Sequence, residues 1–324
     1  MDFLPTEDQE ALRAGVREIC ADAFPRERLG ELAASGAGFD PALWNTLAEL
    51  GVFGLLLPES EGGLGLELGD AVLVFEELGR ALVPGPLVGT LLAAGLPGVE
   101  TGAPVGVFDL SAEEPGRTCL IEHPDVISKL VVLDGDDARI IDASELSTVS
   151  IQPVPDPTDP LTPLGAISQL PAGSPLEGGA APWRTKGAVL TAALETGIAM
   201  AACELAVQYA KEREQFGRTI GSFQAVKHMC SDMHVRAQIA SVAVHSAAVT
   251  LDHPEVGDPA RAIASAKLLA DEAATQNAKT SIQVHGGMGF TWEVVVHYYL
   301  KRGWVHNTQF GDADTHADAL AALL

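Results

Sequence analysis

The stretch Arg213-Glu-Gln-Phe-Gly-Arg-Thr-Ile-Gly-Ser-Phe-Gln224 connects two long helical patterns and carries side chains suited to an anionic ligand. Arg213 ends the first pattern, and its guanidinium offers a fixed fork of donors that matches a phosphate. Gln224 starts the second pattern, where backbone N–H groups point outward and favour negative charge. The connection between the two helices is therefore a candidate anion site.

A second stretch, Gln283-Val-His-Gly-Gly-Met-Gly-Phe290, is rich in glycine. Gly286, Gly287 and Gly289 allow a backbone to approach a flat or charged ligand closely. No strand pattern precedes them, and their spacing differs from the dinucleotide fingerprint. The residues of the two stretches leave two interpretations open: a site for a nucleotide diphosphate, or a plain set of helix caps and turns.

Both stretches lie among helical patterns that predict a bundle over 181–324. A helix over about 188–215, roughly 40 Å long at 1.5 Å per residue, carries one apolar stripe at spacings of three and four: Leu190, Leu194, Ile198, Ala201, Leu205 and Tyr209. Gly217 and Gly221 break this pattern, and Ser222 can cap the next helix. A third helix over about 259–284 stops at Gly286-Gly287, where glycines supply left-handed geometry. Two shorter helices complete the chain.

Residues 1–97 predict a helical domain. Thr6-Glu-Asp-Gln9 has the form of a capping box at the start of its first helix. A second helix has Asp40 as its N-cap, Pro41 at its first position and Gly51 just past its end. The glycine-rich segment Leu55-Leu-Leu-Pro-Glu-Ser-Glu-Gly-Gly-Leu-Gly-Leu66 connects to a helix around 70–81.

Residues 98–180 predict a small β domain, because helical periodicity gives way to short β-type runs rich in flanking Pro, Asp and Gly. The runs are 105–108, 119–121, 130–133 and 139–141. Asp134-Gly135 between the last two indicates a hairpin, with two further Asp residues expected to lengthen its loop. The expected fold class is therefore mainly α with a reduced β domain at 98–180, between helical domains at 1–97 and 181–324.

The composition excludes several classes of protein. The net charge of −24 argues against a nucleic-acid ligand, although a few local donors can still hold a nucleotide. No run of about 18 apolar residues is free of charge, so no transmembrane helix is expected. The start of the chain is acidic and lacks the pattern of a signal peptide. Four scattered cysteines, with no metal-ligand spacing, favour reduced thiols and a cytoplasmic protein.

Together, the two stretches resemble the C-terminal helical domain of the acyl-CoA dehydrogenases, flavoenzymes that desaturate a CoA thioester between Cα and Cβ. The 55–66 segment is similar to the N-terminal domain of that family. The resemblance implies that the two motifs bind the ADP half of an FAD held by the neighbouring subunit. Carried over by position, the contacts to that FAD would be Arg213, Gln215, Phe216, Gln224, Gln283, Gly286 and Gly287. No metal site is expected.

The resemblance also implies a carboxylate that removes the α-proton of the acyl-CoA while a hydride leaves Cβ for the flavin. Most family members carry this Glu near the C-terminus, and Thr308-Gln-Phe-Gly-Asp-Ala-Asp314 places Gly311 at that position. Others carry it at the start of the long helix, where ungapped counting back from Phe216 reaches Gly187. A glycine cannot accept a proton, so the catalytic residue of this chain is unknown.

Two other carboxylates could serve as the base. Asp312 is one residue from the first position, and its alternative role is to cap a helix. Glu195 lies about 12 Å along the helix from Gly187, and its alternative role is that of a buried or interface-paired structural carboxylate. His285 and His297 are interpreted as core or helix-end histidines. In the family that the chain resembles, a loop of the β domain with a Thr or Ser and a Trp lies against the flavin ring. Residues 98–180 contain no such run, and Trp183 lies past their end, so the comparison implies that this domain does not build the wall of a flavin ring.

The pattern resembles the small subunits of actinobacterial heterotetrameric (α2β2) acyl-CoA dehydrogenases. The resemblance implies a homologous catalytic partner, a shared FAD, an electron-transfer acceptor, and a bulky acyl-CoA such as a steroid side-chain ester. The first alternative is a homo-oligomeric enzyme that uses Asp312 or Glu195 as its base. The second is a flavin-free structural subunit.

Overall fold

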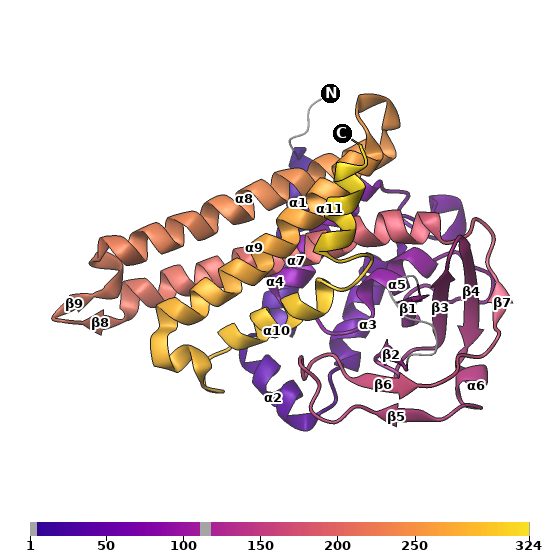
Figure 1. Cartoon of the computed structure of the whole chain (residues 1–324), viewed down its shortest axis with the longest axis horizontal. Coiled ribbons are helices and arrows are strands. Elements are labelled where there is room, and N and C mark those ends of the chain that lie inside the picture. Colours follow the sequence, from indigo (N-terminus) through magenta and orange to yellow (C-terminus); the bar gives the residue numbers. More distant parts are fainter. Residues whose placement is uncertain (1–4, 111–117, 324) are drawn as a thin grey trace. The chain divides into compact units, whose positions relative to one another are not determined.

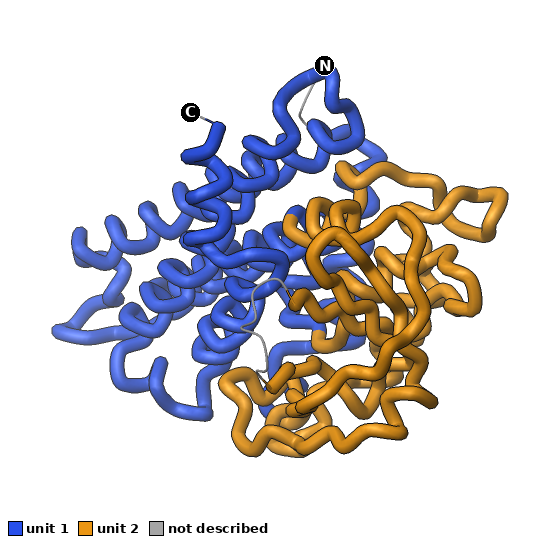
Figure 2. The backbone as a smooth tube through the Cα atoms, turned by 45° about the vertical axis from the view of Figure 1, so that its right-hand side comes forward, with its two compact units in different colours: residues 1–30, 72–83, 189–324 blue, residues 31–71, 84–188 orange. Residues whose placement is uncertain are grey.

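The computed structural model describes residues 5–110 and 118–323, and their chain is mostly helical with a smaller region of strands (Figure 1). The expected fold class is confirmed. The chain divides into two compact units (Figure 2). Unit 1 comprises 1–30, 72–83 and 189–324, and unit 2 comprises 31–71 and 84–188. Residues 1–4, on which the expectation about a signal peptide partly rests, lie outside the described residues.

The N-terminal helices begin where capping residues predict them. Thr6 and Gln9 exchange side-chain and backbone hydrogen bonds of 3.3 and 2.9 Å, which confirms the capping box. Asp40 accepts from the backbone N–H groups of Ala42 and Leu43. The helices and 3-10 turns of this part are α1 (Glu7–Ala23), α2 (Glu27–Ser35), α3 (Pro41–Glu49), η1 (Val52–Gly54), η2 (Glu59–Glu61), α4 (Leu68–Arg80) and α5 (Leu87–Ala93).

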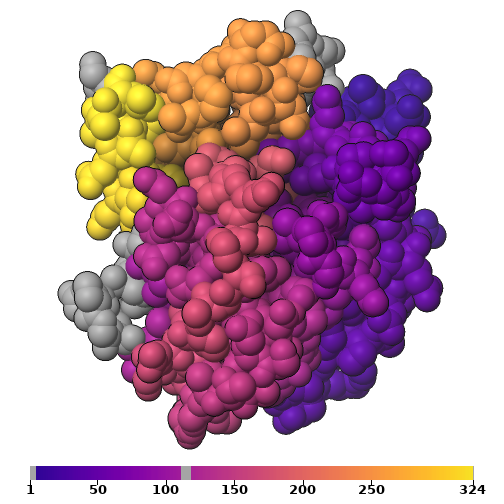
Figure 3. All heavy atoms as spheres, turned by 90° about the vertical axis from the view of Figure 1, so that its right-hand side faces the viewer, coloured from indigo at the N-terminus to yellow at the C-terminus, as the bar shows by residue number. Residues whose placement is uncertain are grey.

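Unit 2 contains two small sheets. In Figure 3 the segment that forms them is magenta and pink, and purple N-terminal segments of the same unit lie beside it. One sheet has the order β1-β3-β4-β7, with β1 and β3 parallel, and the other has the order β2-β6-β5. The elements are β1 (Val105–Asp109), β2 (Cys119–Glu122), β3 (Lys129–Asp134), β4 (Asp137–Asp142), α6 (Ala143–Leu146), β5 (Ile151–Pro153), β6 (Leu164–Ile167) and β7 (Ser174–Pro175). Their core is aliphatic, with Ile121, Leu130, Val132 and Ile141 buried.

The β3–β4 hairpin is tighter than its sequence suggests. Asp134 pairs with Asp137, so the loop consists only of Gly135 and Asp136. Gly135 has φ +54°, as a two-residue hairpin loop requires. The expectation that the additional Asp residues lengthen this loop is wrong, because Asp137 is itself paired in the strand.

The bundle of unit 1 is built around α7 (Ala181–Glu212), whose first residues, 181–188, fall in unit 2. It is followed by α8 (Gln224–Asp252), η5 (Pro254–Val256), α9 (Pro259–His285), η6 (Gly286–Phe290), α10 (Val296–His306) and α11 (Ala313–Ala321). Glycines let α4 and α7 approach closely: a Cβ at Gly197 would lie 1.9 Å from the carbonyl oxygen of Glu76, and one at Gly79 would lie 2.1 Å from that of Leu194.

By length and composition, α7 is the one helix among the described residues that could cross a membrane. However, 89% of the residues in its most apolar window are buried inside the protein. A core helix has the same properties, and Glu195 within α7 is paired inside the bundle rather than exposed.

The four cysteines are free thiols. Cys20, Cys119 and Cys203 are buried, and burial raises the pKa of Cys20 to about 12 and that of Cys203 to about 11. Thiols with such high pKa values are unreactive near neutral pH, which agrees with the expectation of reduced cysteines.

Candidate functional site

The connection between α7 and α8 is a small hairpin that projects from the end of the bundle (Figure 1). Its strands are β8 (Glu214–Gln215) and β9 (Arg218–Thr219), followed by the short turn η4 (Ile220–Ser222). Phe216 and Gly217 form the two-residue tip with φ values of +55° and +75°. A left-handed conformation is uncommon for a phenylalanine, and the side chain of Phe216 is 90% exposed.

Arg213 forms the base of this hairpin through its backbone alone. Its N–H donates to the carbonyl of Tyr209, and its own carbonyl accepts from the N–H of Ile220, both at 2.8 Å. Across residues 5–110 and 118–323, no hydrogen bond or ion pair involves its exposed guanidinium. The fork is therefore held in place at its backbone and left available to an anion from outside the chain.

The start of α8 has uncapped backbone donors. Gln224 is the first residue of this helix and is exposed, and Phe223 precedes it as an N-cap without a side-chain hydrogen bond. The expected capping role of Ser222 is wrong, because Ser222 ends η4 and its hydroxyl donates to the carbonyl of Thr219 at 2.7 Å. The first-turn N–H groups of α8 thus remain without a side-chain acceptor, which suits a bound anion.

Of the three glycines after α9, two are required by the backbone conformation or the packing of this chain and one is not. Gly286 has φ +62°, and a Cβ on Gly289 would lie 2.6 Å from the carbonyl oxygen of Ile282. At Gly287 a Cβ would meet nothing within 4 Å, and its φ is not positive. Folding explains Gly286 and Gly289, whereas at Gly287 the open space fits close approach by an external group.

A ring stack brings the two motifs to the same end of the bundle. Tyr209, one turn before Arg213, stacks on His285 with ring centroids 4.2 Å apart. His285 directly precedes Gly286, and its Nδ1 donates to the carbonyl of Ser281 at 2.8 Å. Burial lowers the pKa of His285, although this hydrogen bond opposes the shift. A neutral ring therefore connects the end of α7 to the end of α9.

All seven predicted contact residues lie on these two segments. Arg213, Gln215 and Phe216 are exposed on the hairpin, and the side chain of Gln215 donates to the carbonyl of Glu214. Gln224 and Gln283 are exposed at helix ends, as are the backbones of Gly286 and Gly287. The arrangement offers one guanidinium, one helix N-terminus and one glycine turn to a ligand that lies outside the bundle.

Sequence reasoning did not single out three aromatic residues that follow the glycines of the two motifs along the chain, of which two are exposed. Phe290 is 81% exposed at the end of η6, and Trp292 follows with the ammonium of Lys301 at 4.3 Å from its ring. The guanidinium of Arg218 lies 4.0 Å from the ring of Phe223. Exposed aromatic residues are enriched at interfaces, and Phe290, directly after Gly289, was the signal available in the sequence.

Gly311, the first position where the resemblance implies a base, is a glycine for structural reasons. It has φ +97°, and a Cβ there would lie 2.8 Å from Nε2 of His316. His316 is buried and its Nε2 lies 3.1 Å from the carbonyl oxygen of Phe310. A side chain at position 311 would therefore be strained and would displace a buried histidine. Gly187, the second position, is buried within α7.

Glu195 is a core carboxylate, as its alternative role predicted. It is fully buried, and its Oε1 lies 3.3 Å from Nζ of Lys267, which also contacts Asp271. Burial raises the pKa of Glu195 well above its usual range, although the Lys267 ammonium opposes the shift. A carboxylate enclosed in this way cannot reach a substrate.

Asp312 is the N-cap of α11, again as its alternative role predicted. Its Oδ1 accepts from the backbone N–H of Thr315 at 2.9 Å and from the Thr315 hydroxyl at 2.6 Å. These hydrogen bonds lower the pKa of Asp312, which makes it a weaker base. His285 ends α9, and His297 lies in α10, where burial lowers its pKa to about 4. Both interpretations of these histidines are confirmed.

Two family models match the chain. The model for the N-terminal domain of acyl-CoA dehydrogenases matches residues 6–100, and the model for the C-terminal domain matches residues 185–323. Acyl-CoA dehydrogenase IpdE2 of Mycobacterium tuberculosis is 38% identical over 314 residues, which covers 92% of this chain and 91% of the relative. IpdE2 of Mycolicibacterium smegmatis is 34% identical, with 92% of each chain covered.

Solved structures share the fold. A structure described as the Tcur3481-Tcur3483 steroid ACAD superposes with a TM-score of 0.82 and 25% identity, covering 98% of this chain and 97% of its own. A chain of the ChsE4-ChsE5 complex from Mycobacterium tuberculosis gives 0.85 at 23% identity, covering 99% and 98%. On the two domain models and the full-length relatives, the chain belongs to the acyl-CoA dehydrogenase family.

Proposed function

We propose that this chain is the non-catalytic subunit of an FAD-dependent acyl-CoA dehydrogenase. It pairs with a homologous catalytic subunit and contributes Arg213, Gln215, Phe216, Gln224, Gln283, Gly286 and Gly287 to the FAD of that partner. The partner provides the catalytic base and most of the acyl pocket. The division of the chain into domains 1–97, 98–180 and 181–324, and its cytoplasmic location, belong to the same proposal.

The observation that carries the proposal is the exposed, left-handed Phe216 at the tip of the hairpin. A 90% exposed aromatic ring in a strained backbone conformation contributes little to the stability of its own chain. Its position suits contact with another subunit, where burial of a phenyl ring is favourable by about 2 kcal/mol. Phe290, 81% exposed at the neighbouring turn, has the same property.

The residues around Phe216 fit the ADP half of FAD. The free guanidinium of Arg213 can form a charge-assisted pair with the diphosphate, and the uncapped N-terminus of α8 adds backbone donors. The open space at Gly287 lets the ligand approach the backbone. Bound at this site, FAD would supply the acceptor for the hydride that leaves Cβ of the acyl-CoA. The contribution of this chain is to hold and orient its nucleotide end.

The two glycines support assignment of the base to the partner. Gly311 cannot carry a side chain without strain, and Gly187 is buried in α7. Glu195 and Asp312 each have a structural role, so the structure gives no observation in favour of a self-sufficient enzyme. A general base must lie within hydrogen-bond reach of the proton that it removes. Because Glu195 is enclosed in the bundle and Asp312 caps α11, we assign that base to the partner.

The names of similar structures support a heteromer that acts on a bulky substrate. One is described as a steroid ACAD whose name joins two labels, and another as a complex of two differently named chains. By analogy, the assembly is an α2β2 tetramer that desaturates an acyl-CoA thioester of a steroid side chain and passes electrons to a separate acceptor. By the same analogy, a smaller substrate pocket in this chain would leave room for a wider one in the partner.

The experiment is purification of the chain alone and after co-expression with a homologous acyl-CoA dehydrogenase subunit. We expect the chain alone to be colourless and inactive, and the complex to retain flavin and oxidise acyl-CoA. A chain that is yellow and active alone would establish the homo-oligomeric alternative. A complex that forms but holds no flavin would establish the flavin-free structural subunit.

A further inference from the structure

The three long helices of the bundle present the proposed FAD contacts at one of their ends. The hairpin follows α7, Gln224 begins α8, and the glycine turn follows α9. Both α7 and α9 run toward this end, and α8 leads away from it (Figure 1). The register of the helices, meaning how far each is shifted along its neighbours, therefore decides whether Arg213, the start of α8 and Gly287 can face the same ligand.

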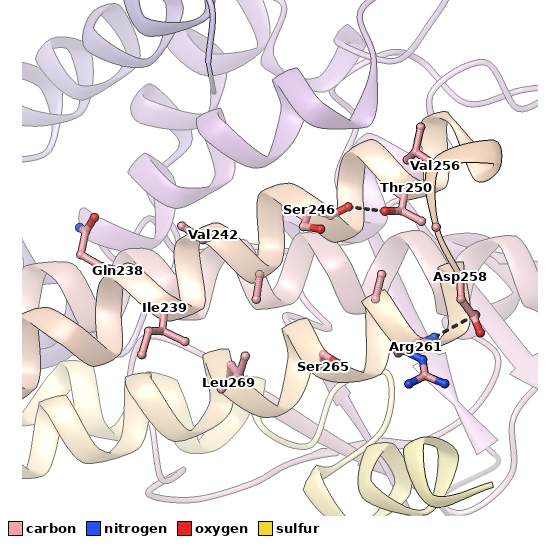
Figure 4. Close-up of a pocket in the computed structure, with 13 residues that line it drawn as sticks. Gln238, Ile239, Val242, Ser246, Thr250, Val256, Asp258, Arg261, Ser265 and Leu269 are labelled. Carbon is pink, nitrogen blue, oxygen red and sulfur yellow. Dashed lines mark hydrogen bonds between the residues drawn. The ribbon is translucent and has the colours of Figure 1, made fainter. Parts of the chain in front are cut away.

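Short side chains on these helices leave their register weakly determined. Ridges of large side chains normally fit into the grooves of a neighbouring helix, but small ones form shallow ridges. Figure 4 shows the second half of α8 beside the first half of α9, where Ser246 and Ser265 are among the residues that line a groove of about 710 Å³. Alanines also recur at spacings of three and four among the buried residues: Ala199, Ala202 and Ala206 in α7, and Ala270, Ala274 and Ala278 in α9.

One polar side chain, that of Asn277 in α9, joins all three helices inside the bundle. Asn277 is fully buried. Its Nδ2 donates to the carbonyl oxygen of Ala199 in α7 at 3.1 Å and to that of Met233 in α8 at 2.8 Å. Its Oδ1 accepts from Nε of Arg236, also in α8, at 3.2 Å. Because a carbonyl only accepts and a guanidinium only donates, these partners fix which way the amide points.

The hydrogen bonds of Asn277 can form in one register only. A slip of one residue moves a backbone carbonyl by 1.5 Å along the axis of its helix and turns it by about 100°. The amide would then be buried without its partners, which is unfavourable. A single buried asparagine selects the register of coiled coils for the same reason.

Two further contacts between α7 and α9 agree with this register. Glu195 lies 3.3 Å from Lys267 on the side of Asn277 away from the proposed site. Tyr209 stacks on His285 on the side toward it, with ring centroids 4.2 Å apart. Since a helix is stiff over such lengths, a shift at Asn277 reaches the glycine turn, about 14 Å further along α9 at 1.5 Å per residue.

We propose that Asn277 is a positioning residue, which sets the register of α7, α8 and α9 so that the three groups of FAD contacts converge on one ligand. This inference rests on the proposed function, because it assigns those contacts to FAD. Asn277 acts through Arg213, the start of α8 and the glycine turn. Its amide contributes selection of one arrangement among several that the short side chains would otherwise allow.

The test is Asn277→Leu, which keeps the branching of the side chain and removes its polar atoms. The two carbonyls lie within helices, whose own hydrogen bonds also use them, and half-buried Arg236 can turn to water. We therefore expect the melting temperature of the isolated chain to fall by no more than about 4 °C. The dissociation constant of FAD from the complex should rise about threefold or more, as it does when a third or less of the molecules hold the competent register.

The matched control is Thr196→Val in α7. Thr196 is also fully buried, but its hydroxyl donates to the carbonyl of Ala192 in the same helix at 2.9 Å. Its loss removes a buried polar group without releasing one helix from another. Both the melting temperature and the affinity for FAD should therefore stay close to those of the wild type.

A distance measurement reads the register directly and does not depend on flavin. Spin labels at Lys211→Cys and Lys279→Cys, both exposed, report the separation of α7 and α9 in the isolated chain. Cys230→Ser removes the one native thiol that is not buried. We expect one narrow distance distribution in the wild type and in Thr196→Val. Asn277→Leu should add a second population or broaden the distribution toward a shift of about one turn, 5.4 Å.

An unchanged label distance in Asn277→Leu would overturn the proposal, as would a weaker affinity for FAD that Thr196→Val shows equally. Asn277→Ala covers the case in which leucine does not fit, and failure of both variants to fold would assign Asn277 a role in folding alone, against the proposal. If the wild-type complex holds no FAD, the proposed function fails by itself. The label distances then still decide whether Asn277 sets the register.

Discussion

Replacement of Arg213 by Ala should weaken FAD binding by the complex without unfolding it. The side chain is exposed and free of partners among the described residues, whereas both backbone groups are hydrogen-bonded at 2.8 Å. A hydrogen bond to a charged group contributes about 1.5–3 kcal/mol. At 1.4 kcal/mol per factor of ten, the dissociation constant of FAD should rise by about 10- to 100-fold.

The assay is equilibrium dialysis of the purified complex against FAD, with flavin absorbance read per pair of chains. Because an exposed substitution changes stability by about 0.5 kcal/mol or less, the melting temperature of the isolated chain should move by no more than about 2 °C. Arg261→Ala is the matched control, since this exposed arginine near the start of α9 is not among the proposed FAD contacts. Unchanged flavin affinity in Arg213→Ala would refute the assignment of this side chain.

Four further predictions concern single substitutions and pH. Gly287→Ala should leave the melting temperature of the isolated chain nearly unchanged but weaken FAD binding by the complex. Gly289→Ala should destabilise the chain, because its Cβ would lie 2.6 Å from a carbonyl oxygen. Equal melting curves for the two variants would contradict this difference. Gly311→Glu should cost about 1–3 kcal/mol through its left-handed backbone and produce no activity in the chain alone; measurable dehydrogenation would show that the position remains competent. Burial lowers the pKa of His297 to about 4, so its contribution to stability is complete above pH 6.5 and is lost as pH falls toward 4. The change of the urea midpoint with pH between pH 6.5 and 5 should therefore be smaller in His297→Gln than in the wild type. An equal change in both proteins would show that this histidine does not cause the pH dependence. Lys267→Met should destabilise the chain by about 3–5 kcal/mol, since it leaves two buried carboxylates without their cation; a urea midpoint equal to that of the wild type would be inconsistent with that pairing.

Local rules predicted most of the helical boundaries. Thr6 and Asp40 cap the helices that follow them, because a short polar side chain next to an apolar pattern has few other uses. The end of α9 at His285 agrees with the glycines after it. The two sheets were harder to predict, since β7, β8 and β9 have only two residues each and carry no periodicity.

The errors at the site have a common cause, which is tertiary context. Ser222 has the residue type of a helix cap, but it ends η4 and its hydroxyl donates to the carbonyl of Thr219, so it does not cap α8. The sequence shows that a glycine, Gly311, stands at the position of the expected base. It does not show that the φ of Gly311 is +97° or that His316 occupies the space beside it. The stack of Tyr209 on His285 joins residues far apart in sequence, and no local pattern encodes it.

The stoichiometry of flavin in the purified complex tests the central claim most directly. If this chain holds the nucleotide end of FAD while its partner holds the reacting ring, each pair of chains contains one FAD. That FAD is lost when the two chains are separated. Two FAD per pair, or a full complement of FAD on this chain alone, would contradict the account.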